Sequence, residues 1–175
     1  MSKGMKKFRA LLLLFFVTLL IPSAAFASMK NKQALRALPA LYVEVLHRGS
    51  FSEIGWEEAP IRVEIENKLK AAGIKVYARR AKELKPDSPY MSLVSNIQCP
   101  PTTGMCGFNV NLSLTQTALL IRDPSLLGKV YTWEVGVTGM VDKKSVSYIR
   151  TKISDLIDEF VKDYREVNPS SPKKK

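Results

Sequence analysis

Apolar and polar side chains alternate with a two-residue period in two stretches of the chain, 107–121 and 130–139. The first stretch alternates four apolar with four short polar side chains: Phe108, Val110, Leu112 and Leu114 against Asn109, Asn111, Ser113 and Thr115. This period is typical of an antiparallel β-strand with one buried face. Leu119 and Ile121 continue the polar side by parity, so part of that face is apolar.

Runs of strand-forming residues predict further strands at 41–46, 74–78 and 90–98. A loop with two prolines and a glycine, 99–106, joins the last of these to 107–121, which predicts a hairpin. Turn signals at 123–125 and a break at Gly128 precede the strand at 130–139.

Two stretches carry apolar residues at helical spacing. Pro60 opens the first, where its missing N–H costs nothing, and Gly73 is placed to end it in a left-handed cap. The second and longer stretch is 145–167, and its apolar stripe is Ile149, Ile153, Leu156, Phe160, Tyr164 and Val167. Each stripe is explained by packing against a sheet, and a helix that pairs with a partner is the alternative for 145–167.

The order of these elements predicts one α+β domain. A strand, a helix and a strand joined by one crossover form a parallel pair, and three antiparallel strands and the long helix follow. We therefore expect a five-stranded mixed sheet with both helices on one face. The opposite face is open to water or to a partner.

The first residues have the pattern of a secretory signal peptide. A basic start, the apolar run 11–21 and the small-residue end Ala25-Phe26-Ala27 predict residues 1–27 as the signal, cleaved after Ala27. A retained anchor is the minor alternative. Removing four basic residues with the signal lowers the formal net charge from +11 to +7. Residues 28–168 then form the domain, and 169–175 a disordered basic tail. We expect a periplasmic or secreted protein without a transmembrane segment in the mature chain.

Cys99 and Cys106 are the only cysteines. In an exported chain they should oxidise to each other, which predicts a disulfide that staples the hairpin loop. A redox role is the less favoured alternative, because the spacing is not C-x-x-C.

A basic cluster that includes Arg79 and Arg80 follows the second predicted strand. It favours either an anionic partner, such as a cell-surface polymer, or simply a solvated loop, which is the commoner case. We expect no nucleic-acid partner, because no aromatic platform accompanies the charge.

The case for catalysis is thin. His47 is the only histidine, and one histidine without a nearby cysteine makes no convincing metal site. We expect no cofactor, no metal and no catalytic residue. Carboxylate chemistry through Glu44 and Glu134, on predicted strands, is the alternative.

Several segments resemble a family of small exported bacterial proteins of unknown function: 64–76, 108–114, 132–134 and 160–169. This resemblance covers nearly the whole mature chain, but its motifs are structural and transfer no catalytic residue. The element order is also similar to envelope α+β modules, namely the amino-terminal domain of the Tol-system propeller protein and the lipopolysaccharide-assembly lipoprotein. The chain lacks the lipidation cysteine of the latter.

The sequence thus favours a non-enzymatic periplasmic or secreted binding or assembly module that docks on an envelope protein or polymer. Its candidate contact residues are Asn109, Asn111, Ser113, Thr115, Arg79 and Arg80. A small secreted hydrolase that uses carboxylates is the alternative, and a secreted effector or inhibitor is a third possibility. The pattern does not predict an oligomeric state.

Overall fold

The structure is a computed structural model that describes residues 25–50, 52–78 and 85–169. Along the chain its elements are β1 (Ala25–Lys30), η1 (Lys32–Leu35), β2 (Leu41–Gly49), α2 (Glu58–Ala71), β3 (Val76–Tyr77), β4 (Tyr90–Gln98), β5 (Met105–Leu120), β6 (Asp123–Asp142), η2 (Lys143–Ser145) and α3 (Ser147–Val167).

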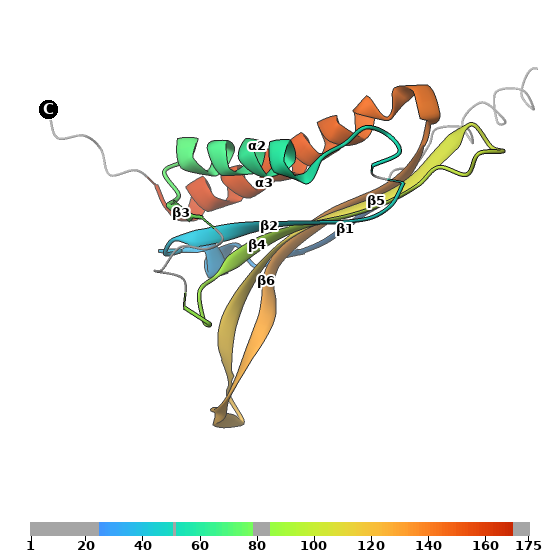
Figure 1. The fold of residues 1–175 in the computed structure, drawn as a ribbon. Helices are drawn as coiled ribbons and strands as arrows, with labels where there is room; N and C mark the ends of the chain where they lie inside the picture. Colours follow the sequence, from blue (N-terminus) through green and yellow to red (C-terminus); the bar gives the residue numbers. More distant parts are fainter. Residues whose placement is uncertain (1–24, 51, 79–84, 170–175) are drawn as a thin grey trace, which may run out of the picture.

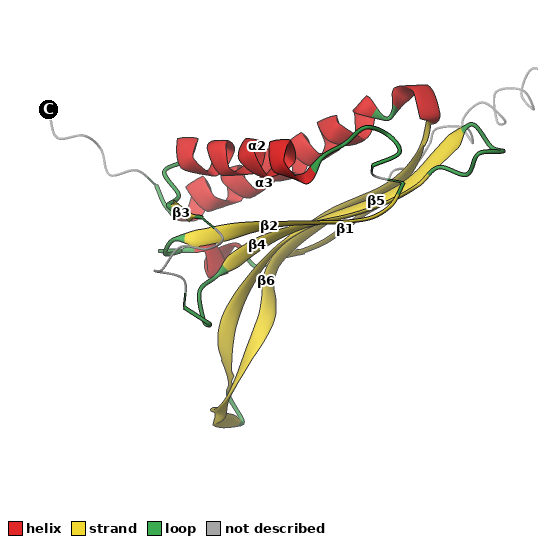
Figure 2. Ribbon diagram, viewed as in Figure 1, coloured by secondary structure: helices red, strands yellow, loops and turns green. Residues whose placement is uncertain are grey.

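All described strands join one mixed sheet, in the order β1-β6-β5-β4-β2-β3. β2 pairs in parallel with both β3 and β4, and the β4–β5, β5–β6 and β6–β1 pairs are antiparallel. Both helices lie on one face of this sheet (Figure 2). The predicted α+β class, the five predicted strands and the helices on one face are therefore confirmed.

The sixth strand, β1, was not predicted. It pairs along its whole length with β6, from Ala25 opposite Thr138 to Lys30 opposite Trp133. The sequence pattern assigns Ala25 to Ala27 to the end of a signal peptide, so cleavage after Ala27 would leave the pairs from Ser28 onward. The first 24 residues lie outside the described part of the chain.

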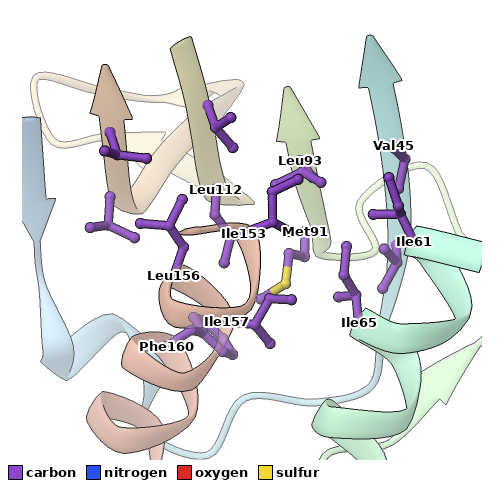
Figure 3. Close-up of a cluster of buried hydrophobic side chains, with 14 of the residues drawn as sticks. Val45, Ile61, Ile65, Met91, Leu93, Leu112, Ile153, Leu156, Ile157 and Phe160 are labelled. Carbon is purple, nitrogen blue, oxygen red and sulfur yellow. The ribbon is translucent and has the colours of Figure 1, made fainter. Parts of the chain in front are cut away.

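The core fills the space between the helices and the sheet. Alternate β5 side chains such as Leu112 meet the apolar stripe of α3, which includes Ile153 and Phe160 (Figure 3). At the edge of this core Trp133 contacts Phe160 edge to face, with ring centroids 4.9 Å apart. Its indole N–H donates to the buried carboxylate of Asp163 at 3.0 Å. The apolar face of β5, set by its two-residue period, thus packs against the apolar stripe of α3, as the sequence predicts.

β6 is longer than the pattern indicated, whereas β5 closely matches the predicted strand 107–121. The expected break at Gly128 is absent, because Gly128 pairs with Ala118 inside the ladder, and β6 begins at Asp123. This correction has a simple cause: a glycine weakens a strand but does not stop the backbone from pairing. The result is a two-stranded arm, residues 116–131, which projects beyond the sheet and away from the helices (Figure 1).

The predicted disulfide joins Cys99 to Cys106, and both cysteines are buried. The backbone N–H of Cys99 also donates to Ser50 Oγ at 3.3 Å, which ties the loop to the end of β2. This stapled loop lies at the opposite end of β5 from the arm (Figure 1). Gly49, just before Ser50, has a φ of 79° that favours glycine.

Replacing Gly49 by alanine should lower the free energy of unfolding strongly. The left-handed backbone costs about 1–2 kcal/mol for a residue with a Cβ, and that Cβ would lie 2.1 Å from the carbonyl oxygen of Ile97. Gly55→Ala is the matched control, because Gly55 has a φ of 74° but no atom within 4 Å of the added carbon. Urea denaturation should show a larger loss for Gly49→Ala, and equal losses would contradict the close contact.

Replacing both cysteines by serine should lower the free energy of unfolding by about 2.5 kcal/mol, the chain-entropy value for so short a loop. The intended readout is the urea midpoint at unchanged slope. Wild-type protein measured with and without reductant is the internal control. A midpoint that does not move in either comparison would show that the disulfide contributes nothing to stability.

Candidate functional site

Exposed large apolar side chains gather on the arm. Of the eleven in the described part of the chain, seven lie there: Leu119, Leu120, Ile121, Leu126, Leu127, Val130 and Tyr131. Ile121, at the tip, is 99% exposed. Single exposed apolar residues are ordinary, but a contiguous group on one projecting element is typical of an interaction site.

The arm is exposed because its neighbours in the sheet end before it does. β4 begins at Tyr90, opposite Thr115, and β1 ends at Lys30, opposite Trp133. Beyond these points β5 and β6 pair only with each other, for example Leu119 with Leu127. Both outer edges of the arm are therefore without a strand partner among the described residues.

The turn at the tip is held by Asp123. Its carboxylate accepts hydrogen bonds from Ser125 Oγ at 2.6 Å and from the Ser125 backbone N–H at 3.1 Å. The hydroxyl and then the backbone N–H lower the pKa of Asp123 below its ordinary value. An aspartate is ionised at neutral pH already at its ordinary pKa, so the tip carries a carboxylate next to the exposed Ile121.

A groove of about 580 Å³ lies at the base of the arm. Four consecutive residues of β5, from Gln116 to Leu119, line one side of it. Successive side chains of a strand point to opposite faces, so a groove that touches four in a row runs along the edge of the strand. The remaining lining residues are Pro39, Ala40, Tyr77, Lys85, Asp87, Ser88, Pro89 and Leu127.

Tyrosines cross the helix-free face beside this groove. Tyr77, Tyr42 and Tyr90 are in register on neighbouring strands, and the Tyr42 and Tyr90 rings stack with centroids 5.3 Å apart. Lys129, from the arm, lies over the Tyr90 ring at 5.7 Å and donates to the carbonyl of Ser88 at 3.1 Å. The lysine thus fastens the base of the arm to the sheet.

The four polar residues predicted on β5 lie on one face, and three of them hydrogen-bond within the sheet, whereas the buried Thr115 Oγ1 has no hydrogen-bond partner among the described residues. Asn109 donates to Thr138 Oγ1 at 2.7 Å, and Asn111 donates to Asn109 Oδ1 at 3.3 Å. Both asparagines are half-buried. Their side-chain amides thus already form hydrogen bonds with other residues of the sheet.

Ser113 and Thr115 are only 4% and 2% exposed, contrary to the expectation that they face water. The Ser113 hydroxyl lies 2.9 Å from that of Ser92 on β4. Because both side chains are buried, these two residues offer little surface to a partner. Arg79 and Arg80 lie outside the described residues.

The two glutamates considered for catalysis share one row of the helix-free face. Glu44 pairs with Ser92, Ser92 with Ser113, and Ser113 with Glu134. Three strand spacings, about 14 Å, thus separate their backbones. Among the described residues no group of three or more His, Cys, Asp or Glu side chains could hold a metal ion. No described helix has the length and apolar character needed to span a membrane.

No protein-family model matches the chain, and no curated protein matches it. The solved structures that are similar at low identity include two of PelC and one of a virulence factor. A dodecamer of a leucine-to-methionine variant of PelC from Paraburkholderia phytofirmans is 13% identical, with a TM-score of 0.42 over 82% of this chain and 98% of that chain. The PelC dodecamer from the same organism is 10% identical, with a TM-score of 0.40 over 85% and 99%. The Evf virulence factor is 8% identical, with a TM-score of 0.19 over 82% and 54%.

Sequence reasoning missed the arm as a site, although part of its signal was visible. The parity of β5 places Leu119 and Ile121 on the side opposite Leu112 and Leu114, which already indicates an apolar strip away from the core. The expected strands 90–98 and 107–121 already differ in length, but the next strand was expected to begin only at 130, so nothing was expected to pair with 116–121 and form an arm.

Truncating an arm leucine should leave stability almost unchanged. Leu127 is 70% exposed, so Leu127→Ala should alter the free energy of unfolding by less than about 0.5 kcal/mol. The matched control is Leu112→Ala in the buried part of the same hairpin, which should cost about 2–5 kcal/mol. Thermal and urea unfolding of the two variants provide the test, and a comparable loss in both would show that the arm belongs to the core.

Proposed function

We propose that this chain is an exported, non-enzymatic binding module that docks on a protein of the cell envelope through its arm. The observation that supports this most directly is the group of apolar side chains on a projecting hairpin. The arm lies away from the core, so the apolar character of Ile121 and Leu127 is better explained by a contact than by folding.

A protein surface suits the arm better than the interior of a bilayer. Unpaired backbone N–H and C=O groups each cost several kcal/mol in hydrocarbon, and both edges of the arm carry them. The carboxylate of Asp123 at the tip adds a charge, and its hydrogen bonds from Ser125 lower the pKa of that group. A partner protein can supply hydrogen bonds to the edges and leave the tip charge in water.

Export is part of the same proposal. The disulfide between Cys99 and Cys106 suits an oxidising compartment such as the periplasm or the exterior. The signal peptide expected at 1–27 provides the route. The arm of a periplasmic or secreted protein would then meet envelope proteins directly.

Photocrosslinking in the native host tests the docking proposal. A photoreactive residue at Ile121 should give a discrete covalent adduct, because this side chain is the most exposed apolar group of the arm. Val63 on α2 is the matched control, since it is also apolar and 54% exposed, and the helix α2 lies on the other side of the sheet from the arm (Figure 1). Adducts at both positions, or at neither, would contradict docking through the arm.

Glutamine variants separate this proposal from carboxylate catalysis. Glu44→Gln and Glu134→Gln leave the arm unchanged, so the adduct at position 121 should form with undiminished yield. A gene-deletion phenotype that the wild-type chain restores and the glutamine variants do not, with the adduct retained, would point to chemistry on the helix-free face instead of docking.

A further inference from the structure

The peptide bond that the sequence predicts as the signal cleavage site lies inside β1. Ala27, before this bond, pairs with Gly136, and Ser28, after it, pairs with Val135. Three residues of β1 lie on each side of the bond. β1 stands at the end of the strand order, so β6 is its one strand neighbour in the described sheet. The predicted cleavage site is therefore part of a hydrogen-bonded ladder.

Contacts just after the bond hold this part of the chain against α3. Lys30, the last residue of β1, forms a salt bridge with Glu159. Two residues later, Lys32 forms salt bridges with Asp163 at 3.1 Å and with Glu166 at 2.6 Å. Exposed ion pairs are individually weak. Together, however, these contacts keep β1 beside β6 and favour its pairing.

The bond must leave the ladder before it can be cut. Proteolytic cleavage concentrates in segments that backbone hydrogen bonds do not hold, and a protein that binds an extended segment pairs with its backbone in place of a neighbouring strand. In the hydrolysis, water adds a hydroxyl group to the carbonyl carbon of Ala27 and a proton to the amide nitrogen of Ser28, and the bond between these two atoms breaks. Both atoms belong to the β1–β6 ladder. Cleavage and pairing of β1 thus exclude each other.

We propose that the sheet closes the cleavage site, so that the bond after Ala27 is cut only while β1 is not yet paired with β6. The proposal rests on the proposed function in assuming that the chain is exported with its signal segment. A chain that is cut before β1 pairs is released without residues 1–27. A chain in which β1 pairs first keeps the signal segment as a membrane anchor. The arm is the same in both forms, so the order of the two events decides where the docking surface is presented.

Cleavage of the folded precursor tests the proposal. The full chain, refolded in detergent micelles, is treated with a purified signal peptidase, and mass spectrometry identifies the product that begins at Ser28. Its cleavage should be about tenfold or more slower than that of a fragment of residues 1–98, because only the open fraction of a paired strand can be cut. The fragment has the same bond at the same distance from the apolar run, but it lacks β5 and β6.

A chain in which residues 22–27 are repeated, with a Gly-Ser spacer between the copies, is the matched control. Its second copy precedes Ser28 and takes its place in β1, whereas its first copy lies outside the strand. The folded repeat chain should be cut after its first copy as fast as the fragment. A repeat chain as slow as wild type would overturn the proposal, because the block would not depend on β1. Equal rates for the folded wild-type chain and the fragment would also overturn it, as would a fragment that is not cut after Ala27.

Hydrogen exchange provides an independent measure of the pairing. In a chain that begins at Ser28, residues 136–138 lose their partners, residues 25–27. In the same micelles, exchange at 136–138 should be faster than in the full chain, whereas exchange at Leu93, in the β4–β5 pair, should not change. Equal exchange at 136–138 in both chains would show that β1 does not cover the bond. The adduct at position 121 depends on none of these results, so this proposal and the proposed function fail separately.

Discussion

The length of β5 relative to its neighbours is the constraint on which the rest of the structure depends. β5 runs from Met105 to Leu120, whereas β4, its partner on one side, begins opposite Thr115. The helices cover the part of β5 that β4 also accompanies, and there the apolar side chains are buried (Figure 3). Beyond Thr115 only β6 continues, so the same strand becomes half of a solvent-exposed arm. One strand, β5, thus contributes its inner part to the core and its last residues to the candidate site.

A second set of contacts joins η1 and the loop after it to the end of α3. The ammonium group of Lys32 forms salt bridges with Glu166 and Asp163. Both carboxylates raise the pKa of the lysine above its ordinary value, and Glu166 has the larger effect. Asn168 then accepts from the Ala37 N–H at 2.8 Å and donates to the carbonyl of Leu35 at 2.8 Å. These polar contacts surround the buried Leu35 and hold the end of the long helix at the edge of the sheet. The helix stripe alone would not fix that position, because apolar contacts are non-directional.

Periodicity in the sequence was sufficient for the fold class, and it was insufficient for strand β1, for the full length of β6 and for the site. The alternation in β5 and the helical spacing in α3 indicate which side chains are buried, because both patterns follow directly from backbone geometry. Gly73 ends α2 with a φ of 85°, as its position after the apolar stripe indicates. Two features depend on distant neighbours and leave no local signal. One is the burial of Ser113 and Thr115. The other is the pairing of Gly128 inside a ladder that local turn propensity argues against.

β5 also explains how the arm can be presented in a fixed direction. A two-stranded hairpin is only marginally stable by itself in water. Here the arm continues strands that are paired on both sides within the sheet, and the stapled loop secures the other end of β5 at Cys106. Lys129 adds a contact at the base through Tyr90 and Ser88. Burial in the core therefore offsets the entropic cost of ordering the inner half of the hairpin. A partner needs to order only the exposed remainder, which lowers the entropic cost of docking.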